Sequence, residues 1–507
     1  MSHAVPLLGK KEAARPEQAA QNGARNDGTA SFVRTCLNGV NALSGVGVLS
    51  VPYALSEGGW LSLLLLAAVA AACWYTGLLV GRCMDADPAI RTYPDIGQRA
   101  FGPPGRLLVS SFLYAEVYLV AVGFLILDGD NLDKLFPDSG VALGPVSLAG
   151  KQLFVALVAL IVAPTTWLRS LGVLAYVSAA GVFASVVVVL SVLWVAAVDG
   201  VGFSGRGTTT PLRLAGLPTA LGLYTFCYCG HAVFPTLYTC MKQKSQFPKM
   251  LAICFVLCTL NYGSMAVLGY LMYGDGVQSQ VTLNLPAARL SSKIAIYTTL
   301  VNPLAKYALM VTPIATVVEE RIYVAVGQGS AVPVAVRTLL VLSTVVVAVA
   351  LPFFGYLMAL VGSFLSVGVS MLLPCVCYLR IFGAPSMNCC RTAMEAGAIF
   401  GILALGALVA VTGTYSSVMQ IIHHLDHVCI SIARSSYVEK GKREKHEDIP
   451  KWRKIGMPLT NATPLVSLVC SFAIVAGLAM LTLSLAETAI VLLPMDISMP
   501  SYFAKLE

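Results

Sequence analysis

A short apolar stretch near the start of the chain combines residues that helices in a membrane rarely carry together. NGVNALSGVGVLSVPYAL, residues 38–55, contains three glycines, two serines and one proline. Glycine adds backbone entropy and proline removes a hydrogen bond, so we expect this helix to break inside the membrane. Backbone groups at that depth need partners unless the irregular segment lines an enclosed cavity. The stretch therefore predicts a place where free N–H and C=O groups contact a bound solute or ion.

A second interrupted helix is expected in the other half of the chain. LYTFCYCGHAVFPTLY, residues 223–238, carries Gly230, His231 and Pro235 inside the sixth apolar run. A single interruption fits ordinary kinking, because glycine and proline are common in membrane helices. Two interruptions at matching positions, at the heads of two sets of five helices, favour a binding site at the interface of an inverted five-plus-five repeat.

The groups at the two breaks match the two charged ends of an α-amino acid. N–H groups of the first break suit a carboxylate, and carbonyls of both breaks suit an ammonium group. Neighbouring amide and hydroxyl side chains add polarity, and two tyrosines are expected to shape the side-chain pocket; packing between helices is the alternative role for each. The expected substrate-binding residues are Asn38, Asn41, Ser44, Gly45, Val46, Gly47, Tyr118, Cys229, Gly230 and Tyr307.

Three ionisable residues inside apolar runs are candidates for proton coupling. His231 lies in the second break and is the side chain there that titrates near neutral pH, although a purely structural hydrogen bond is the alternative. Glu116 lies near the centre of the third run, and Lys306 lies deep in the eighth. An ion pair between Glu116 and Lys306 is one way to hold both charges in a membrane. Structural pairing and proton transfer remain open for Glu116, and a structural role is favoured for Lys306.

The composition indicates which elements position these residues. Of the 507 residues, 57% are hydrophobic and 11% are charged, whereas soluble domains carry about a quarter charged residues. Many apolar runs reach the ~20 residues that a helix needs to cross a bilayer, so we expect an all-α polytopic membrane protein. The expected runs lie near residues 32–55, 59–83, 106–127, 150–168, 171–198, 215–240, 249–273, 294–320, 333–351, 353–380 and 393–422.

The charged residues indicate orientation and the extent of the domain. Lys and Arg concentrate in the loops that are cytosolic when the N-terminus is cytosolic, which favours that topology and leaves no basis for nucleic-acid binding. Residues 1–30 are expected to be a disordered cytosolic segment, and residues 31–422 an eleven-helix core. Residues 423–507 form an atypical tail, with a charged linker (423–463) and a candidate twelfth helix (464–493).

Several separate motifs carry a family resemblance. They are GVNALSGVGVLSVPYALSEGGW, RTYPDIGQRAFG, LYAEVYLV followed by LDGDNLDKLFP, CYCGHAVFPTLYTCMKQKSQFPK and NPLAKYALMVTPIATVVEE. Over residues 30–422 the chain resembles the amino acid/auxin permease family, and within it the plant vacuolar amino acid transporters. The resemblance implies eleven helices of the leucine-transporter type, and amino acid transport coupled to protons or sodium. The chain departs from the family in continuing well beyond GTYSS (Gly413–Ser417) and in placing Cys227 and Cys229 around the second break.

These observations favour a secondary active transporter that moves amino acids by alternating access, coupled to protons, with sodium as the other coupling ion considered. We expect it in the vacuolar or another endomembrane. Two alternatives are a transporter of auxin-like or other small organic acids or amines, and an amino-acid receptor that does not transport. An enzyme is not expected, because no nucleophile–base set or metal constellation emerges, and we expect no cofactor or metal. The sequence does not fix an oligomeric state.

Overall fold

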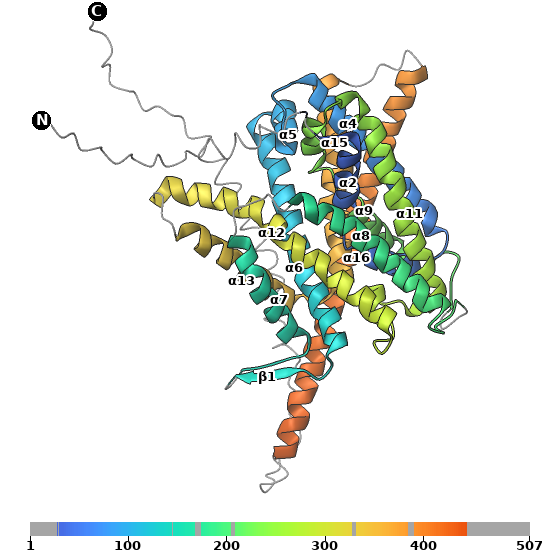
Figure 1. Ribbon diagram of the computed structural model, residues 1–507, viewed down its shortest axis with the longest axis vertical. Helices are drawn as coiled ribbons and strands as arrows, with labels where there is room; N and C mark the ends of the chain where they lie inside the picture. The colour runs from blue at the N-terminus through green and yellow to red at the C-terminus, as the bar shows by residue number, and fades with distance from the viewer. Residues whose placement is uncertain are drawn as a thin grey trace, which may run out of the picture.

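The computed structural model describes residues 28, 30–143, 146–167, 174–203, 208–326, 331–383 and 390–443. Within these ranges the chain is almost entirely helical, and its helices pack into one bundle (Figure 1). The expected twelfth helix, residues 464–493, and residues 1–27 of the N-terminal segment 1–30 that was expected to be disordered lie outside the described residues.

The first expected membrane helix is broken, as predicted. It consists of α2 (Phe32–Leu43) and α3 (Gly47–Gly58), whose axes differ by 51°. The three residues between them include Gly45, which leaves the backbone free to change direction. Pro52 lies inside α3 and removes one further helical hydrogen bond.

The sixth expected helix is interrupted in the same way. Helix α9 (Leu217–Cys227) is followed by an irregular segment, and α10 (Phe234–Cys240) continues the run. Pro235 stands in the first turn of α10, where its missing N–H has no helical partner to lose. The irregular segment covers six residues, twice the length of the break in the first helix.

Each of the other expected runs contains a helix. These helices are α4 (Ser62–Ala86), α6 (Pro103–Leu135), α7 (Lys151–Trp167), α8 (Leu174–Ala197), α11 (Phe247–Tyr273), α12 (Leu290–Val326), α13 (Val332–Ala350), α14 (Phe354–Leu360) with its continuation to residue 382, and α16 (Cys390–Arg443). Within the described ranges, eight helices are long and apolar enough to cross a membrane, and the bent pair α2–α3 makes a ninth span. Helix α7 has 17 residues and α9 has 11 residues, so both are shorter than the ~20 residues of a full span.

The tenth run contains a rare π-helical segment. After α14 come η6 (Val361–Ser366) and η7 (Gly368–Leu372), both π-helical, and then α15 (Leu373–Phe382). Pro374 follows directly after the π-helical residues and cannot donate a backbone hydrogen bond to the turn before it. π-Helical turns often accompany functional sites.

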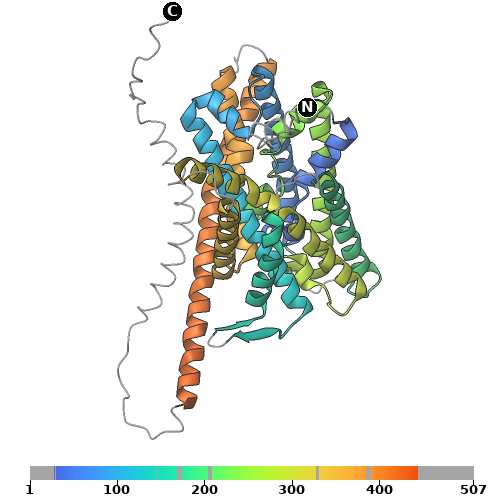
Figure 2. The same cartoon turned by 60° about the vertical axis from the view of Figure 1, so that its left-hand side comes forward.

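Short elements connect the membrane helices. Strands β1 (Gly140–Leu143) and β2 (Val146–Ala149) form an antiparallel hairpin in which Gly140 lies opposite Ala149. The other short elements are α5 (Tyr93–Phe101), η2 (Leu214–Gly216), η3 (Lys244–Gln246), η4 (Gly274–Gly276) and η5 (Val281–Asn284). Helix α16 stands at the edge of the bundle and extends beyond it (Figure 2). It is helical as far as Arg443, into the segment expected to be a charged linker.

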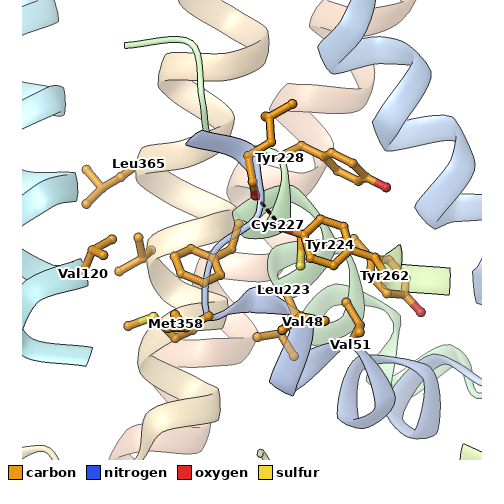
Figure 3. Packing of buried hydrophobic residues seen from close by; sticks show 14 of the residues in the cluster. Val48, Val51, Val120, Leu223, Tyr224, Cys227, Tyr228, Tyr262, Met358 and Leu365 are labelled. Carbon is orange, nitrogen blue, oxygen red and sulfur yellow. Dashed lines mark hydrogen bonds between the residues drawn. The ribbon is translucent and has the colours of Figure 1, made fainter. Parts of the chain in front are cut away.

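The bundle has a buried centre and an apolar outer surface. The two broken helices form its centre, where α3 packs against α9 and α11 (Figure 3). Large apolar side chains are exposed on outer helices, including Phe183 at 71%, Leu260 at 63% and Leu339 at 65%. Exposed apolar surface of this extent is what contact with lipid requires, so the protein is a multi-pass membrane protein.

The chain just before α2 is bonded to the chain just after α10. The Gly28 N–H donates to the Thr239 carbonyl at 3.2 Å, and the Ala30 N–H donates to the Cys240 carbonyl at 2.9 Å. The Lys242 N–H donates back to the Ala30 carbonyl at 3.2 Å. The outer ends of the half-helices α2 and α10 are therefore joined by three backbone hydrogen bonds.

Candidate functional site

The two breaks lie directly against each other. A Cβ atom on Gly47, at the start of α3, would lie 2.8 Å from the Sγ atom of Cys227 at the end of α9. In the second break, a Cβ atom on Gly230 would lie 2.7 Å from the side chain of Leu43, the last residue of α2. Any larger side chain at either glycine would push the helices apart. The expectation that both breaks belong to one site thus agrees with the packing.

A tyrosine from α11 bridges the break in the first helix. The Tyr262 hydroxyl donates to the Leu43 carbonyl and accepts from the Gly45 N–H at 3.4 Å. Its ring is fully buried and packs edge-on against Tyr228 from the second break, with 5.7 Å between ring centroids (Figure 3). Tyr262 therefore contacts both breaks and holds the first one in its unwound form.

An ammonium group occupies the carbonyls that this unwinding exposes. Lys306 of α12 is 7% exposed, and its Nζ atom donates to the carbonyls of Asn41 at 3.1 Å and Ser44 at 3.2 Å. The positive charge of Lys306 therefore lies at the negative, carboxyl end of the half-helix α2, where a cation is stabilised. The chain itself supplies a cation at the first break.

The other side of this break is open to a small cavity. No side chain caps the start of α3 within the described part of the chain, so its first N–H groups carry the positive end of a helix dipole. A cavity of about 20 Å³, the size of one water, adjoins Gly45 and Val46 and is lined by hydroxyl and amide side chains of α8 and α12. Ser44 is fixed there, because its hydroxyl donates to Ser185 Oγ at 2.8 Å. These N–H groups are suited to a carboxylate.

The second break is organised around His231, which is fully buried. Its Nε2 atom lies 3.1 Å from the Cys73 carbonyl and 2.9 Å from the Thr76 hydroxyl. A carbonyl can only accept, so Nε2 carries the hydrogen. The Nδ1 atom is buried and has no hydrogen-bond partner among the described residues. In the neutral ring Nδ1 thus keeps a free lone pair, which is the position where a proton can bind.

The proline after the π-helical segment leaves two carbonyls without a helical donor, and one of them bonds Thr76, a partner of His231. An α-helical bond to the Ser370 carbonyl, or a π-helical bond to the Val369 carbonyl, would need an N–H on Pro374. Side-chain hydroxyls from other elements donate to both carbonyls in place of the missing N–H. The Thr76 hydroxyl lies 2.6 Å from the Ser370 carbonyl, and the Tyr93 hydroxyl donates to the Val369 carbonyl at 2.6 Å. Through Thr76, the tenth membrane helix therefore positions His231.

Glu116 also contacts the second break. It is 6% exposed, and its Oε1 atom accepts from the Ser366 hydroxyl of the π-helical segment at 2.5 Å. The thiol of Cys229 hydrogen-bonds to the same serine and lies close enough to Glu116 to interact electrostatically. Glu116, Ser366 and Cys229 thus bring together α6, the tenth run and the second break.

The expected ion pair between Glu116 and Lys306 is not formed. No ion pair joins these two side chains within the ranges that the structure covers. Lys306 bonds the carbonyls of the first break, and Glu116 bonds Ser366 beside the second. The physical reason is that exposed carbonyls satisfy a buried ammonium without a counter-ion. Each ionisable group therefore belongs to its own break.

The remaining expected site residues lie at different distances from the breaks. The side-chain oxygen Oδ1 of Asn41 is buried against Gly181 of α8 and unpartnered among the described residues, while Asn38 is half-buried on α2 and takes no part in these contacts. The hydroxyls of Tyr118 and Tyr307 bond Ser343 at 3.1 Å and Thr344 at 2.6 Å, both on α13. These two tyrosines join membrane helices instead of contacting the breaks through their polar groups.

Three important side chains were absent from the residues expected from sequence: Tyr262, Thr76 and Ser366. All three lie inside apolar runs that were not expected to be broken. The available signal was chemical, because a hydroxyl buried in a membrane helix must find a partner. Nothing in the sequence showed that those partners would be the backbone and side chains of the two breaks.

Comparisons with known proteins identify the family of the chain. A family described as transmembrane amino acid transporter protein matches residues 28–419. The Arabidopsis thaliana protein "Amino acid transporter AVT1I" is 52% identical over 397 residues, covering 78% of this chain and 96% of the relative. "Amino acid transporter AVT1J" of the same plant is 52% identical over 394 residues, covering 78% and 92%.

A solved structure shares the fold. The crystal structure of MhsT in complex with L-phenylalanine aligns with a TM-score of 0.50 at 13% identity, covering 77% of this chain and 99% of that one. The fold is therefore of the leucine-transporter type, with its five-plus-five arrangement followed by an eleventh helix. The protein is a transporter and not an enzyme: the chain belongs to the transmembrane amino acid transporter family, the amino acid/auxin permeases.

Proposed function

We propose that this protein is a secondary active transporter that moves amino acids by alternating access, with protons as the coupling ion. Family membership supports amino acids as the substrate class. The two broken helices pack against each other, and the uncapped start of α3 offers backbone N–H groups for the carboxylate of an α-amino acid. The observation that carries the choice of proton is the position of the Lys306 ammonium.

Carbonyls of an unwound helix attract a cation, which can be sodium or a protonated group. Here the carbonyls of Asn41 and Ser44 already bind the ammonium of Lys306. A lysine cannot leave the site, but it can release its proton and so become neutral. Loss of that proton would remove the positive charge that these carbonyls and the carboxyl end of α2 stabilise, which would weaken both hydrogen bonds and free the half-helix α2 to move. This favours protons over sodium as the coupling ion.

The titratable groups at the second break would act in the same cycle. His231 has a free lone pair on Nδ1, and Glu116 is a buried carboxyl held by Ser366. Both groups can bind or release a proton without leaving the helices that position them. The uncapped start of α3 would bind the substrate carboxylate. Apolar side chains such as Val48 and Leu223 surround the crossing, which favours substrates with uncharged side chains (Figure 3).

We infer further that the protein resides in the vacuolar or another endomembrane with its N-terminus in the cytosol. The distribution of Lys and Arg between loops supports this orientation. The likeness of its motifs to plant vacuolar amino acid transporters supports the membrane. A fluorescent fusion at each terminus, with quenching from the cytosolic side, tests both statements.

The deciding experiment is uptake into proteoliposomes. Radiolabelled amino acids are supplied in sodium-free buffer with and without an imposed pH gradient, and then with a sodium gradient at equal pH. Accumulation that collapses with the pH gradient supports proton-coupled transport, and accumulation with sodium alone overturns the choice of ion. Competition by unlabelled amino acids, auxin-like acids and amines defines the substrate class. Binding of amino acids without accumulation under either gradient would favour a receptor.

A further inference from the structure

Three sulfur atoms meet between the half-helix α2 and helix α11, away from the contacts described above. The Sγ atom of Cys254 lies 3.6 Å from the Sδ atom of Met250. The thiol of Cys36 hydrogen-bonds to the thiol of Cys254, whose Sγ also lies 3.5 Å from the Cys36 carbonyl. We call Cys36, Met250 and Cys254 the sulfur cluster.

A glycine makes this meeting possible. A Cβ atom on Gly39 would lie 2.8 Å from Cys254 Sγ and 3.3 Å from Met250 Sδ. Both sulfur atoms therefore rest directly on the backbone of α2. Residues three or four positions apart share one face of a helix, which places Cys36 next to Gly39 and Met250 next to Cys254. The cluster is thus built by the packing of two helices.

We propose that the sulfur cluster binds one soft monovalent cation of the Cu⁺ class. Thiolate and thioether sulfurs are the donors that Cu⁺ prefers. Two sulfurs that share a metal at about 2.3 Å, in a trigonal arrangement, lie about 4 Å apart, so the observed 3.6 Å requires a shift of a few tenths of an ångström. Zinc is not suited, because in the described residues no third Cys, His, Asp or Glu joins the two thiols.

The binding step balances in charge. Cu⁺ forms bonds to the sulfur atoms of Cys36 and Cys254, and both thiols release their protons to solvent, which leaves one negative charge on the complex. The ammonium of Lys249 is close, because it lies 5.9 Å from the ring centroid of Phe32, one turn from Cys36. Met250 adds an uncharged third donor. The ion can enter through Cys36, which is half-buried, whereas Cys254 is buried.

A bound ion would join α2 to α11. The half-helix α2 is the part of the first broken helix that would move if the breaks act as hinges. Occupation of the sulfur cluster therefore holds α2 in place and stops uptake. The effect on uptake rests on the proposed transport function, whereas ion binding does not.

Binding is tested first, on the purified full-length protein in detergent. Cu⁺ is titrated under reducing conditions in competition with a coloured Cu⁺ chelator, and thiolate-to-copper absorbance is followed in the near ultraviolet. The wild-type protein should hold one equivalent more than Cys36→Ser or Cys254→Ser. Met250→Leu, which keeps the volume and removes the thioether, should weaken binding by about tenfold. Cys375→Ser, at a buried cysteine of α15, is the matched control and should bind as the wild type does.

Uptake is then measured in proteoliposomes with and without Cu⁺. The wild type and Cys375→Ser should lose uptake on addition of Cu⁺, and Cys254→Ser should keep it. Equal copper stoichiometry and affinity in wild type, Cys254→Ser and Met250→Leu would overturn the site. If Cys254→Ser binds one copper equivalent less than the wild type, the site is supported. If the wild type also shows no uptake before copper is added, that result counts against the proposed transport and not against the site. Size-exclusion profiles show whether each variant is folded. If a serine variant does not fold, the copper affinity of Met250→Leu decides whether the site exists.

Discussion

The two breaks at the centre of the bundle satisfy their backbone in different ways. The first is short, and its carbonyls are bonded by the ammonium of Lys306, while Tyr262 links Leu43 to Gly45. The second is twice as long and is held by side chains that can gain or lose a proton, above all His231. The first break therefore contains the ammonium of Lys306, and the second contains an imidazole and a carboxyl with no lysine among their hydrogen-bond partners in the described residues.

This difference indicates a division of roles. Removal of a cation from the first break exposes two buried carbonyls, which is costly in a membrane. Protonation in the second break changes charge beside the carboxyl of Glu116 and the carbonyls freed by Pro374. Changes at the first break should abolish uptake or its coupling to protons, whereas changes at the second should alter the response to a pH gradient and leave amino acid binding intact.

The largest effect is expected from Lys306→Met. The carbonyls of Asn41 and Ser44 lose their donor, at about 1–3 kcal/mol each. Uptake should fall on the order of 100-fold, since about 1.4 kcal/mol corresponds to a factor of ten. Initial rates in proteoliposomes measure this. Lys306→Arg keeps the positive charge but does not release its proton, so it should fold and bind substrate without proton-driven accumulation. Normal uptake by Lys306→Met would remove the distinction between the breaks.

Glu116→Gln should separate binding from coupling. Glutamine can still bond the Ser366 hydroxyl but cannot carry a transferable carboxyl proton. One coupled proton supports about tenfold accumulation per pH unit, because a pH unit is worth about 1.4 kcal/mol. In the variant the ratio of uptake with and without the gradient should fall to about one, while amino acid binding by equilibrium dialysis is retained. An unchanged gradient response would assign Glu116 a structural role only.

Thr76→Val tests the link between the tenth helix and His231. Valine has nearly the same shape but leaves the Ser370 carbonyl without its donor, at a cost of about 1–2 kcal/mol. Uptake should fall by about tenfold, and the pH at which it is half-maximal should shift, because His231 loses a partner. Thr76→Ser keeps the hydroxyl and should behave as the wild type. Normal uptake by Thr76→Val together with a loss in Thr76→Ser would show that the methyl group matters and the hydrogen bond does not.

Tyr262→Phe should have the smallest effect. The Leu43 carbonyl loses the tyrosine but still accepts from the Gly45 N–H at 3.0 Å. We expect a change of about 1 kcal/mol, seen as a rise in the KM for amino acid of about fivefold with little change in maximal rate. A loss as large as that of Lys306→Met would show that the tyrosine is as important as the ammonium in keeping the first break open.

The sequence predicted the breaks better than their partners. Both broken helices were found because Gly45, Gly230 and Pro235 act on their own backbone, so the signal is local. The partners depend on which helices meet, and this is a property of packing. The expectation of a Glu116–Lys306 pair was wrong because both residues found uncharged partners on other elements. Tyr262 and Thr76 were missed for the same reason, since a hydroxyl in an apolar run does not reveal its acceptor.

The backbone bonds around Ala30 have a mechanical consequence. They join the start of α2 to the end of α10, so the outer halves of both broken helices are fastened together. A rotation of α2 would therefore also turn α10, although some 200 residues separate the two half-helices in the chain. In the proposed alternating access, two hinges would therefore turn one body, and a change of charge at either break would act on both half-helices together.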